Sequence, residues 1–222
     1  MLSYLKQFKI FFIIFAIVSI IIMAIIYNIL KVEQPLPVYK PAQIDASLVD
    51  SSIQDKRKYH RIADFKLINQ NGDTITQDDY KDKIYVADFF FTTCQSICPI
   101  MTDQMFRVQQ TILNDDEVKL LSHSVTPEID SVAQLKRYAI EKGVNDQKWN
   151  LVTGDRKQIY DLARKSYLVV KDDGLQDYGM IHTENFALID KDKQIRGMYD
   201  GTSKASVDSL LMDIEKLKKS YH

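Results

Sequence analysis

The sequence predicts an α/β fold, a mixed β-sheet flanked by helices, over residues 58–222. Apolar runs of strand length alternate there with segments whose apolar residues recur at helical spacing, and this order is typical of helices packed around a sheet. A further observation is the position of Cys94 and Cys98, which lie between the apolar run 84–91 and the helical pattern that follows Pro99. They are the two cysteines of the chain. This strand-to-helix junction is therefore the candidate site.

Each predicted element rests on a local pattern. Residues 65–76 read as a hairpin, because Asn71-Gly72 is a typical two-residue turn. The continuous apolar run 84–91 has the length of a buried central strand. Helix ends are predicted from capping residues and glycine. The later elements, in chain order, are a helix after Pro99 with Met101, Met105, Val108 and Ile112 on one face, a strand over 118–125, a helix capped by Asp130 and ended by Gly143, a helix capped by Asp155, a hairpin of 185–189 and 194–199, and a last helix carrying Val207, Leu210, Leu211, Ile214 and Leu217.

The first thirty residues differ from the rest. Residues 10–30 are almost wholly apolar, and a helix of this length crosses a hydrocarbon core of ~30 Å. Lys6 and Lys9 precede the run, so the positive-inside rule leaves the N-terminus in the cytoplasm. A cleaved signal peptide is the alternative, but the run exceeds the usual apolar region of about 7–15 residues and no small-residue cleavage site follows it. We expect a single-pass anchor over 1–30 in the cell inner membrane, with the C-terminal domain on the periplasmic side.

Composition and the next segment limit the class of protein. Residues 31–57 contain Pro35, Pro37 and Pro41 without sustained periodicity, so we predict an extracytoplasmic linker. The formal net charge of −1 provides no basic surface for nucleic acid. Close thiols in an oxidising compartment tend to form disulfides. One such pair in a domain of this size indicates a functional pair.

Two thiols at the start of a helix can serve redox exchange or bind a soft metal. Pro99 disfavours a helical conformation at Cys98, so we expect the helix to begin at Pro99, with both thiols in the preceding loop. The positive end of the helix dipole would then lower the pKa of both thiols. The spacing of Cys94 and Cys98 also fits an intramolecular disulfide. Spacing alone therefore leaves a metal site and a dithiol reductant both open.

The motifs of this domain resemble those of the Sco/SenC family, copper proteins that assist assembly of the copper site of cytochrome c oxidase. Residues 91–101 are similar to the family signature F-T-x-C-x-x-x-C-P-x-M. Residues 125–130 are similar to its V-D-P-E-x-D turn, and residues 177–183 to its D-x-x-x-x-H-T segment. Thr126 and Gln95 depart from the pattern, standing where aspartate and proline are frequent. The resemblance runs from about residue 61 to the C-terminus and implies a thioredoxin-like fold.

The resemblance also implies a function and a ligand set. Copper would be bound by Cys94, Cys98 and His182, as Cu(I) and, with the imidazole, also as Cu(II). The protein would be a metallochaperone rather than an enzyme. Its implied partners are the copper-receiving subunit of a respiratory oxidase, expected to be subunit II, and a thiol reductant.

Asp88 keeps a thiol-disulfide oxidoreductase as the alternative. It lies six residues before Cys94 in the apolar strand, and thioredoxins carry a buried acidic residue at this offset that assists proton transfer. The redox set would then be Cys94, Cys98 and Asp88, whereas the plain interpretation is an aspartate facing solvent at a strand end. Thioredoxins, however, have two residues between their cysteines and a later cis-proline. Here three residues intervene and no proline follows Pro127. A metal or redox sensor is a third possibility, for which we find no dedicated feature.

Overall fold

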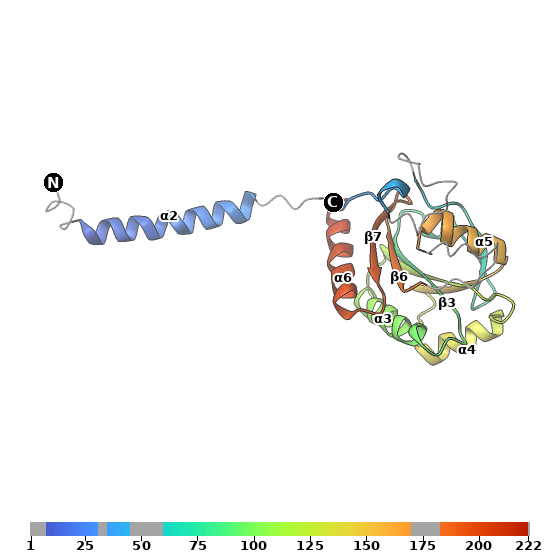
Figure 1. Cartoon of the computed structure of the whole chain (residues 1–222). Helices are drawn as coiled ribbons and strands as arrows, with labels where there is room; N and C mark the ends of the chain where they lie inside the picture. Colours follow the sequence, from blue (N-terminus) through green and yellow to red (C-terminus); the bar gives the residue numbers. More distant parts are fainter. Residues whose placement is uncertain (1–7, 31–34, 45–59, 170–182, 222) are drawn as a thin grey trace. The chain divides into compact units, whose positions relative to one another are not determined.

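The computed structural model describes residues 8–30, 35–44, 60–169 and 183–221, and the chain divides into two compact units, Met1–Pro35 and Leu36–His222. The first unit holds α2 (Lys9–Leu30), a single continuous helix (Figure 1). Over Lys9–Tyr27 this helix is long and apolar enough to cross a membrane. The helix covers the apolar run 10–30 of the sequence, and its role as a membrane anchor stays a prediction.

The second unit is built on a mixed sheet. In the described residues seven strands pair in the order β2-β1-β5-β4-β3-β6-β7. β3 is parallel to β4 and β4 to β5, whereas the pairs β1–β2, β1–β5, β3–β6 and β6–β7 are antiparallel. The strands are β1 (Lys66–Asn69), β2 (Thr74–Thr76), β3 (Ile84–Phe90), β4 (Val118–Ser124), β5 (Trp149–Thr153), β6 (Asn185–Ile189) and β7 (Ile195–Asp200).

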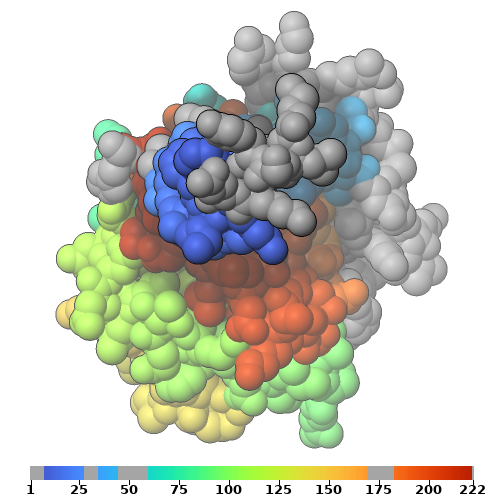
Figure 2. All heavy atoms as spheres, turned by 90° about the vertical axis from the view of Figure 1, so that its left-hand side faces the viewer, coloured from blue at the N-terminus to red at the C-terminus, as the bar shows by residue number. Residues whose placement is uncertain are grey.

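Helices cover both faces of this sheet (Figure 1). One face packs against α3 (Ile97–Thr111), α4 (Val132–Lys142) and α6 (Lys204–Lys219). The other face packs against α5 (Arg156–Asp161) and the π-helical turn η4 (Leu162–Tyr167). In the space-filling view, α3 in green and α6 in red form neighbouring parts of one surface (Figure 2). Short 3-10 turns η1 (Pro41–Gln43) and η3 (Gln77–Tyr80) complete the described elements.

The central strand β3 divides the core into two layers. All seven of its residues are buried. Its side chains alternate between the faces, so that Val86 and Phe90 contact the layer of α3 while Tyr85 and Phe89 contact the layer of η4. This explains why residues 84–91 read as one apolar run. A strand covered on both faces needs no polar alternation.

Several predicted turns and caps are confirmed. Gly72 adopts φ +85° between β1 and β2, a conformation that favours glycine. Gly143 ends α4 with φ +69°. Asp155 caps α5, where its side chain accepts a hydrogen bond from the Gln158 N–H at 2.7 Å.

The predicted start of the helix after the cysteines is wrong. α3 begins at Ile97, so Cys98 lies in its first turn and Pro99 is its third residue. The first four N–H groups of a helix have no partner within it. A proline at the third position therefore sacrifices no helical hydrogen bond.

The predicted cap of α4 is also wrong, by one residue. Ser131 is the cap, and its hydroxyl accepts the Gln134 N–H at 3.3 Å. Asp130 is instead completely buried and contacts the loop that leads to Cys94.

The predicted linker, residues 31–57, lies largely outside the described residues. From Leu36 onward its described part belongs to the second unit. The Tyr39 N–H donates to the carbonyl of Ile195 at 2.8 Å, and Arg196 donates to the carbonyl of Pro37 at 3.0 Å. This stretch is therefore attached to β7.

Candidate metal centre

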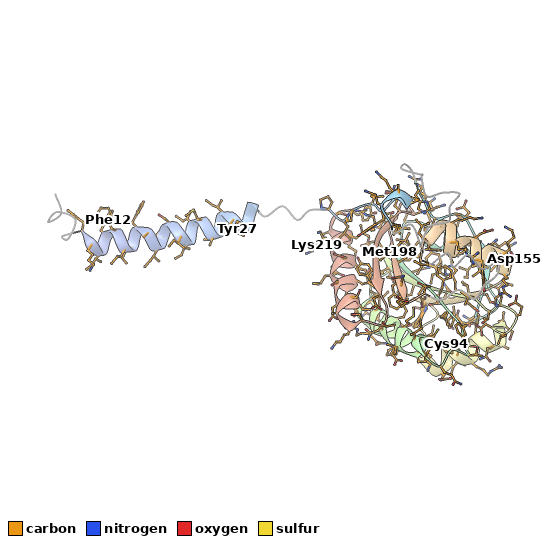
Figure 3. All side chains as sticks on the ribbon, viewed as in Figure 1. Phe12, Tyr27, Cys94, Asp155, Met198 and Lys219 are labelled. Atoms are coloured by element: carbon orange, nitrogen blue, oxygen red, sulfur yellow. The ribbon has the colours of Figure 1, made fainter. Side chains whose placement is uncertain are left out.

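The two cysteines lie where β3 ends and α3 begins. Cys94 is half-buried in the connecting loop, and Cys98 is only 3 % exposed in the first turn of α3. Neither is in a disulfide. The backbone N–H of Cys98 donates to the Cys94 sulfur at 3.4 Å, so the first thiol accepts one of the N–H groups that have no partner within the first turn of α3. Figure 3 shows Cys94 at the end of the domain where α3 and α4 lie.

The two thiols have opposite acidities. For Cys94, burial raises the pKa, but hydrogen bonds from the Cys98 thiol and from the backbone N–H groups of Cys98 and Ser96 together lower the pKa to about 7. For Cys98, burial raises the pKa to about 12, and the hydrogen bond to Cys94 adds to the rise. The prediction of a lowered pKa therefore holds for Cys94 and is wrong for Cys98. Cys94 is the more accessible and more acidic of the two.

A small cavity of about 60 Å³ joins the dithiol to the segment before β6. Its walls include both cysteines, the aromatic side chains of Phe89 and Phe91, and Thr183. Thr183 is buried and its hydroxyl accepts the Asn185 N–H at 3.1 Å. The chain thus returns to the dithiol at the residue that follows His182 in the sequence. His182 itself lies outside the described residues.

The chemistry of this cavity suits a soft metal ion. It presents two sulfur donors against apolar walls, and thiolates select soft ions such as Cu(I). The cavity is also larger than the volume of about 30 Å³ that one water molecule occupies in the liquid. Within the part of the chain that the structure describes, no group of three His, Cys, Asp or Glu residues is placed to hold a metal.

Asp88 is buried in β3, so the solvent-facing interpretation is wrong. It is 2 % exposed and alternates onto the face of Val86 and Phe90, the layer to which Cys98 also belongs. One carboxyl oxygen, Oδ1, has no hydrogen-bond partner among the described residues. Burial raises the pKa of Asp88 to about 7, against a hydrogen bond from Ser122 that lowers it.

His123 does not belong to the dithiol site. It lies in β4 with no exposed surface, and its ring stacks on Phe89 with centroids 4.6 Å apart. Its Nδ1 is 3.2 Å from the carbonyl oxygen of Asp88. Burial lowers the pKa of His123 to about 4, so the ring is neutral at neutral pH. It is a core histidine.

Asp130 organises the loop that leads to Cys94, a role that sequence reasoning missed. Its Oδ1 accepts the Thr92 hydroxyl at 2.5 Å, and its Oδ2 accepts the Thr92 N–H at 3.2 Å. Oδ2 also accepts the hydroxyls of Ser124 at 2.6 Å and Thr126 at 3.1 Å. The carboxylate therefore joins the loop before Cys94 to the end of β4. Thr126 takes part through its hydroxyl, although aspartate is frequent at its position in proteins with the V-D-P-E-x-D turn.

Comparison with known proteins identifies the family of this chain. The SCO1/SenC family model matches residues 53–219. The SCO1 protein homolog of Bacillus subtilis is 30% identical over 167 residues, which cover 73% of this chain and 85% of that protein.

Solved structures share the fold. BsSco, a member of the Sco family of cytochrome c oxidase assembly proteins with an identified disulfide switch, is 30% identical with a TM-score of 0.61, and the match covers 71% of this chain and 93% of that one. The copper-bound structure of Bradyrhizobium japonicum ScoI is 26% identical with a TM-score of 0.57, and covers 72% of this chain and 99% of that one. The second unit thus has the thioredoxin-like Sco fold. The chain belongs to the SCO1/SenC family.

Proposed function

We propose that this chain is a membrane-anchored copper metallochaperone that assists assembly of the copper site of a respiratory cytochrome c oxidase. Copper, its cargo, is held by Cys94, Cys98 and His182. The observation that carries this proposal is the cavity that brings both thiols together with Thr183, the residue next to His182. The oxidase-assembly role of BsSco and the bound copper of the Bradyrhizobium relative support the same function.

The acidities of the thiols fit a carrier that loads and releases its ion. With a pKa of about 7, Cys94 is about half ionised at neutral pH, whereas burial keeps the proton on Cys98. Metal binding requires the thiolate, so loading releases the Cys98 proton. Two thiolates favour Cu(I), and the imidazole of His182 extends the site to Cu(II). Transfer proceeds by ligand exchange, in which thiolates of the receiving subunit, subunit II, displace the three ligands in turn.

The anchor sets the compartment. α2, with Lys6 before it and Lys9 as its first residue, holds the chain in the inner membrane by a single pass, with the domain on the periplasmic side. Disulfides form in that compartment. A thiol reductant is therefore the second partner, because an oxidised Cys94–Cys98 pair cannot bind copper.

The test is an anaerobic Cu(I) titration of the reduced full-length chain in non-ionic detergent, against a chromophoric competitor. The chain should bind one copper ion. Cys94→Ser, Cys98→Ser and His182→Ala should each weaken binding by at least about tenfold. His60→Ala is the matched control, because the His60 ring lies 2.7 Å from the carbonyl of Ser166, away from the dithiol, and binding should not change. Undiminished affinity in either serine variant would overturn the proposal.

A second function, thiol-disulfide oxidoreductase, is favoured by Asp88. This buried carboxyl has a pKa of about 7 and an Oδ1 without a partner in the described residues, on the core layer of Cys98. The Cys94 thiolate would attack a partner disulfide, and one partner sulfur would leave as a thiolate. Cys98 would then attack the mixed disulfide while Asp88 takes its proton. The products are an oxidised Cys94–Cys98 pair and a reduced partner.

The two functions differ in their need for the imidazole. In cells that depend on the chain for oxidase assembly, His182→Ala should abolish assembly by a copper carrier and leave a reductase nearly unaffected. A reductase should also accumulate a mixed disulfide with its partner in the Cys98→Ser variant. Assembly that survives His182→Ala, together with such a trapped disulfide, would select the reductase.

A further inference from the structure

Cys94 separates two hollows of different size. On one side lies the cavity of about 60 Å³ that also contains Cys98 and Thr183. On the other side lies a groove of about 320 Å³ between the Cys94 loop, Pro99 and helix α4. Among the described residues, Cys94 is the one that lines both. Cys94 is therefore the residue at which a molecule in the groove comes nearest to an ion in the cavity.

The groove carries one uncompensated positive charge. On its α4 wall, Lys142 pairs with Glu141 at 2.9 Å, so these two charges offset each other. Arg137 on the same wall is exposed and donates to the neutral Gln134 side chain at 2.5 Å. Within the part of the chain that is described, Arg137 has no carboxylate partner at salt-bridge distance. A carboxylate entering the groove would supply that partner.

We propose that this groove receives an acidic, cysteine-bearing segment of the polypeptide with which the chain exchanges copper. A carboxylate of the segment pairs with Arg137, and its cysteine then meets Cys94 from the groove side. The groove volume, at the small end of ligand sites, suits a few side chains of a peptide. This inference rests on the proposed copper-carrier function, and it names the face by which the partner enters.

The placement also orders the exchange. The incoming thiolate donates an electron pair to copper, and the bond between copper and the Cys94 sulfur breaks with its electron pair returning to that sulfur. No group is oxidised or reduced. Cys98 lines the cavity and not the groove, so its bond to copper breaks after that of Cys94.

The test measures the charge preference of Cys94 toward peptides. The full-length Cys98→Ser chain, in non-ionic detergent, reacts with short peptides that carry one cysteine as its 2-pyridyl disulfide and either Asp, Ser or Lys two residues away. The Cys94 thiolate attacks the peptide sulfur, and pyridine-2-thiolate leaves with the electron pair and is followed by absorbance. The Asp peptide should react about threefold faster than the Ser peptide, the effect expected of one partly exposed ion pair. The Lys peptide should react more slowly than both.

Arg137→Gln should abolish this preference, and Arg61→Gln is the matched control. Arg61 is exposed and precedes Ile62, whose N–H donates to the carbonyl of Lys193 in the β6–β7 turn. That turn lies beside the start of β3, at the opposite end of the sheet from Cys94, because β6 is antiparallel to β3. Arg61→Gln should therefore keep the preference for the acidic peptide.

The inference is overturned if the Cys98→Ser chain with Arg137 intact reacts no faster with the Asp peptide than with the Ser peptide. It is also overturned if the faster reaction with the Asp peptide remains after Arg137→Gln. A Cu(I) titration of the Arg137→Gln chain with both cysteines present should still give one bound ion, because Arg137 does not line the cavity. If the chain with Arg137 and both cysteines binds no copper, while the Cys98→Ser chain still prefers the Asp peptide, the copper-carrier proposal fails and the docking groove stands.

Discussion

Replacing Asp130 by Asn tests whether a single buried carboxylate positions the Cys94 loop. The carboxylate is completely buried and accepts hydrogen bonds from the Thr92 N–H and from the hydroxyls of Thr92, Ser124 and Thr126. Asn keeps one acceptor oxygen and places an NH₂ group at the other, so one or more of these contacts is lost. Hydrogen bonds to a charged group contribute about 1.5–3 kcal/mol each, and we expect a loss of about 2–4 kcal/mol in the free energy of unfolding.

The assay combines stability with thiol reactivity. Unfolding of the full-length chain by denaturant can be followed by fluorescence of Trp149, the single tryptophan, which is buried in β5. The alkylation rate of Cys94 reports the site, and it should change in Asp130→Asn because the loop has lost its attachment to β4.

Asp190→Asn is the matched control. Asp190 is also buried, at 2 % exposure, and accepts hydrogen bonds from the Gln194 N–H at 2.8 Å and from Arg196 at 2.9 Å. It lies in the β6–β7 turn, at the far end of the sheet from Cys94. It should lose comparable stability with no change in Cys94 alkylation. If Asp130→Asn and Asp190→Asn alter Cys94 equally, or if Asp130→Asn costs less than about 0.5 kcal/mol, the positioning role is refuted.

Three further predictions concern acidity and backbone conformation. Alkylation of Cys94 by iodoacetamide should be half-maximal near pH 7 and slow as pH falls, because the thiolate reacts; a midpoint near the ordinary thiol value would contradict the hydrogen-bonded geometry. Asp88 has a folded pKa of about 7, above its ordinary 3.8, so its contribution to stability is complete below about pH 4 and is lost as pH rises through 7. The free energy of unfolding of Asp88→Asn, measured with denaturant, should therefore exceed that of the unmodified chain by up to about 4 kcal/mol at about pH 8 and by nothing at about pH 3. If variant and unmodified chain unfold alike at both pH values, the carboxyl is not desolvated. Gly143→Ala should lower the free energy of unfolding by about 1 kcal/mol or more, because φ is +69° and the added methyl lies 3.0 Å from the Phe106 ring. An unchanged unfolding midpoint would argue against this helix end.

Local features of the fold could be predicted from the sequence because short segments determine them. The hairpin at Gly72, the end of α4 at Gly143 and the cap of α5 at Asp155 each depend on one residue's backbone or side-chain preference. The helix start at Ile97 was missed for a physical reason. The Cys94 sulfur accepts a hydrogen bond from the Cys98 N–H, and this contact stabilises a helix that begins at Ile97, two residues before Pro99.

Contacts between distant segments could not be predicted in this way. Asp130 accepts a hydrogen bond from Thr92, which lies 38 residues away in the sequence. Because Asp130 comes just before an apolar helical pattern, the sequence alone equally predicts a helix cap. The burial of Asp88 depends on helices covering both faces of β3, which the strand's own residues do not specify. The pairing of Cys94 and Cys98 with His182 came from motif resemblance. Thr183, the residue after His182, lines the cavity that contains both cysteines, and the ligand set itself stays a prediction.

The central claim, a copper site of two sulfurs and one imidazole, is tested most directly by X-ray absorption spectroscopy of the reduced full-length chain loaded with one equivalent of Cu(I). The spectrum should show two sulfur scatterers and the outer-shell pattern of one imidazole, and that pattern should disappear in His182→Ala. A spectrum with sulfur alone, or an imidazole pattern that persists in His182→Ala, would contradict the proposed ligand set.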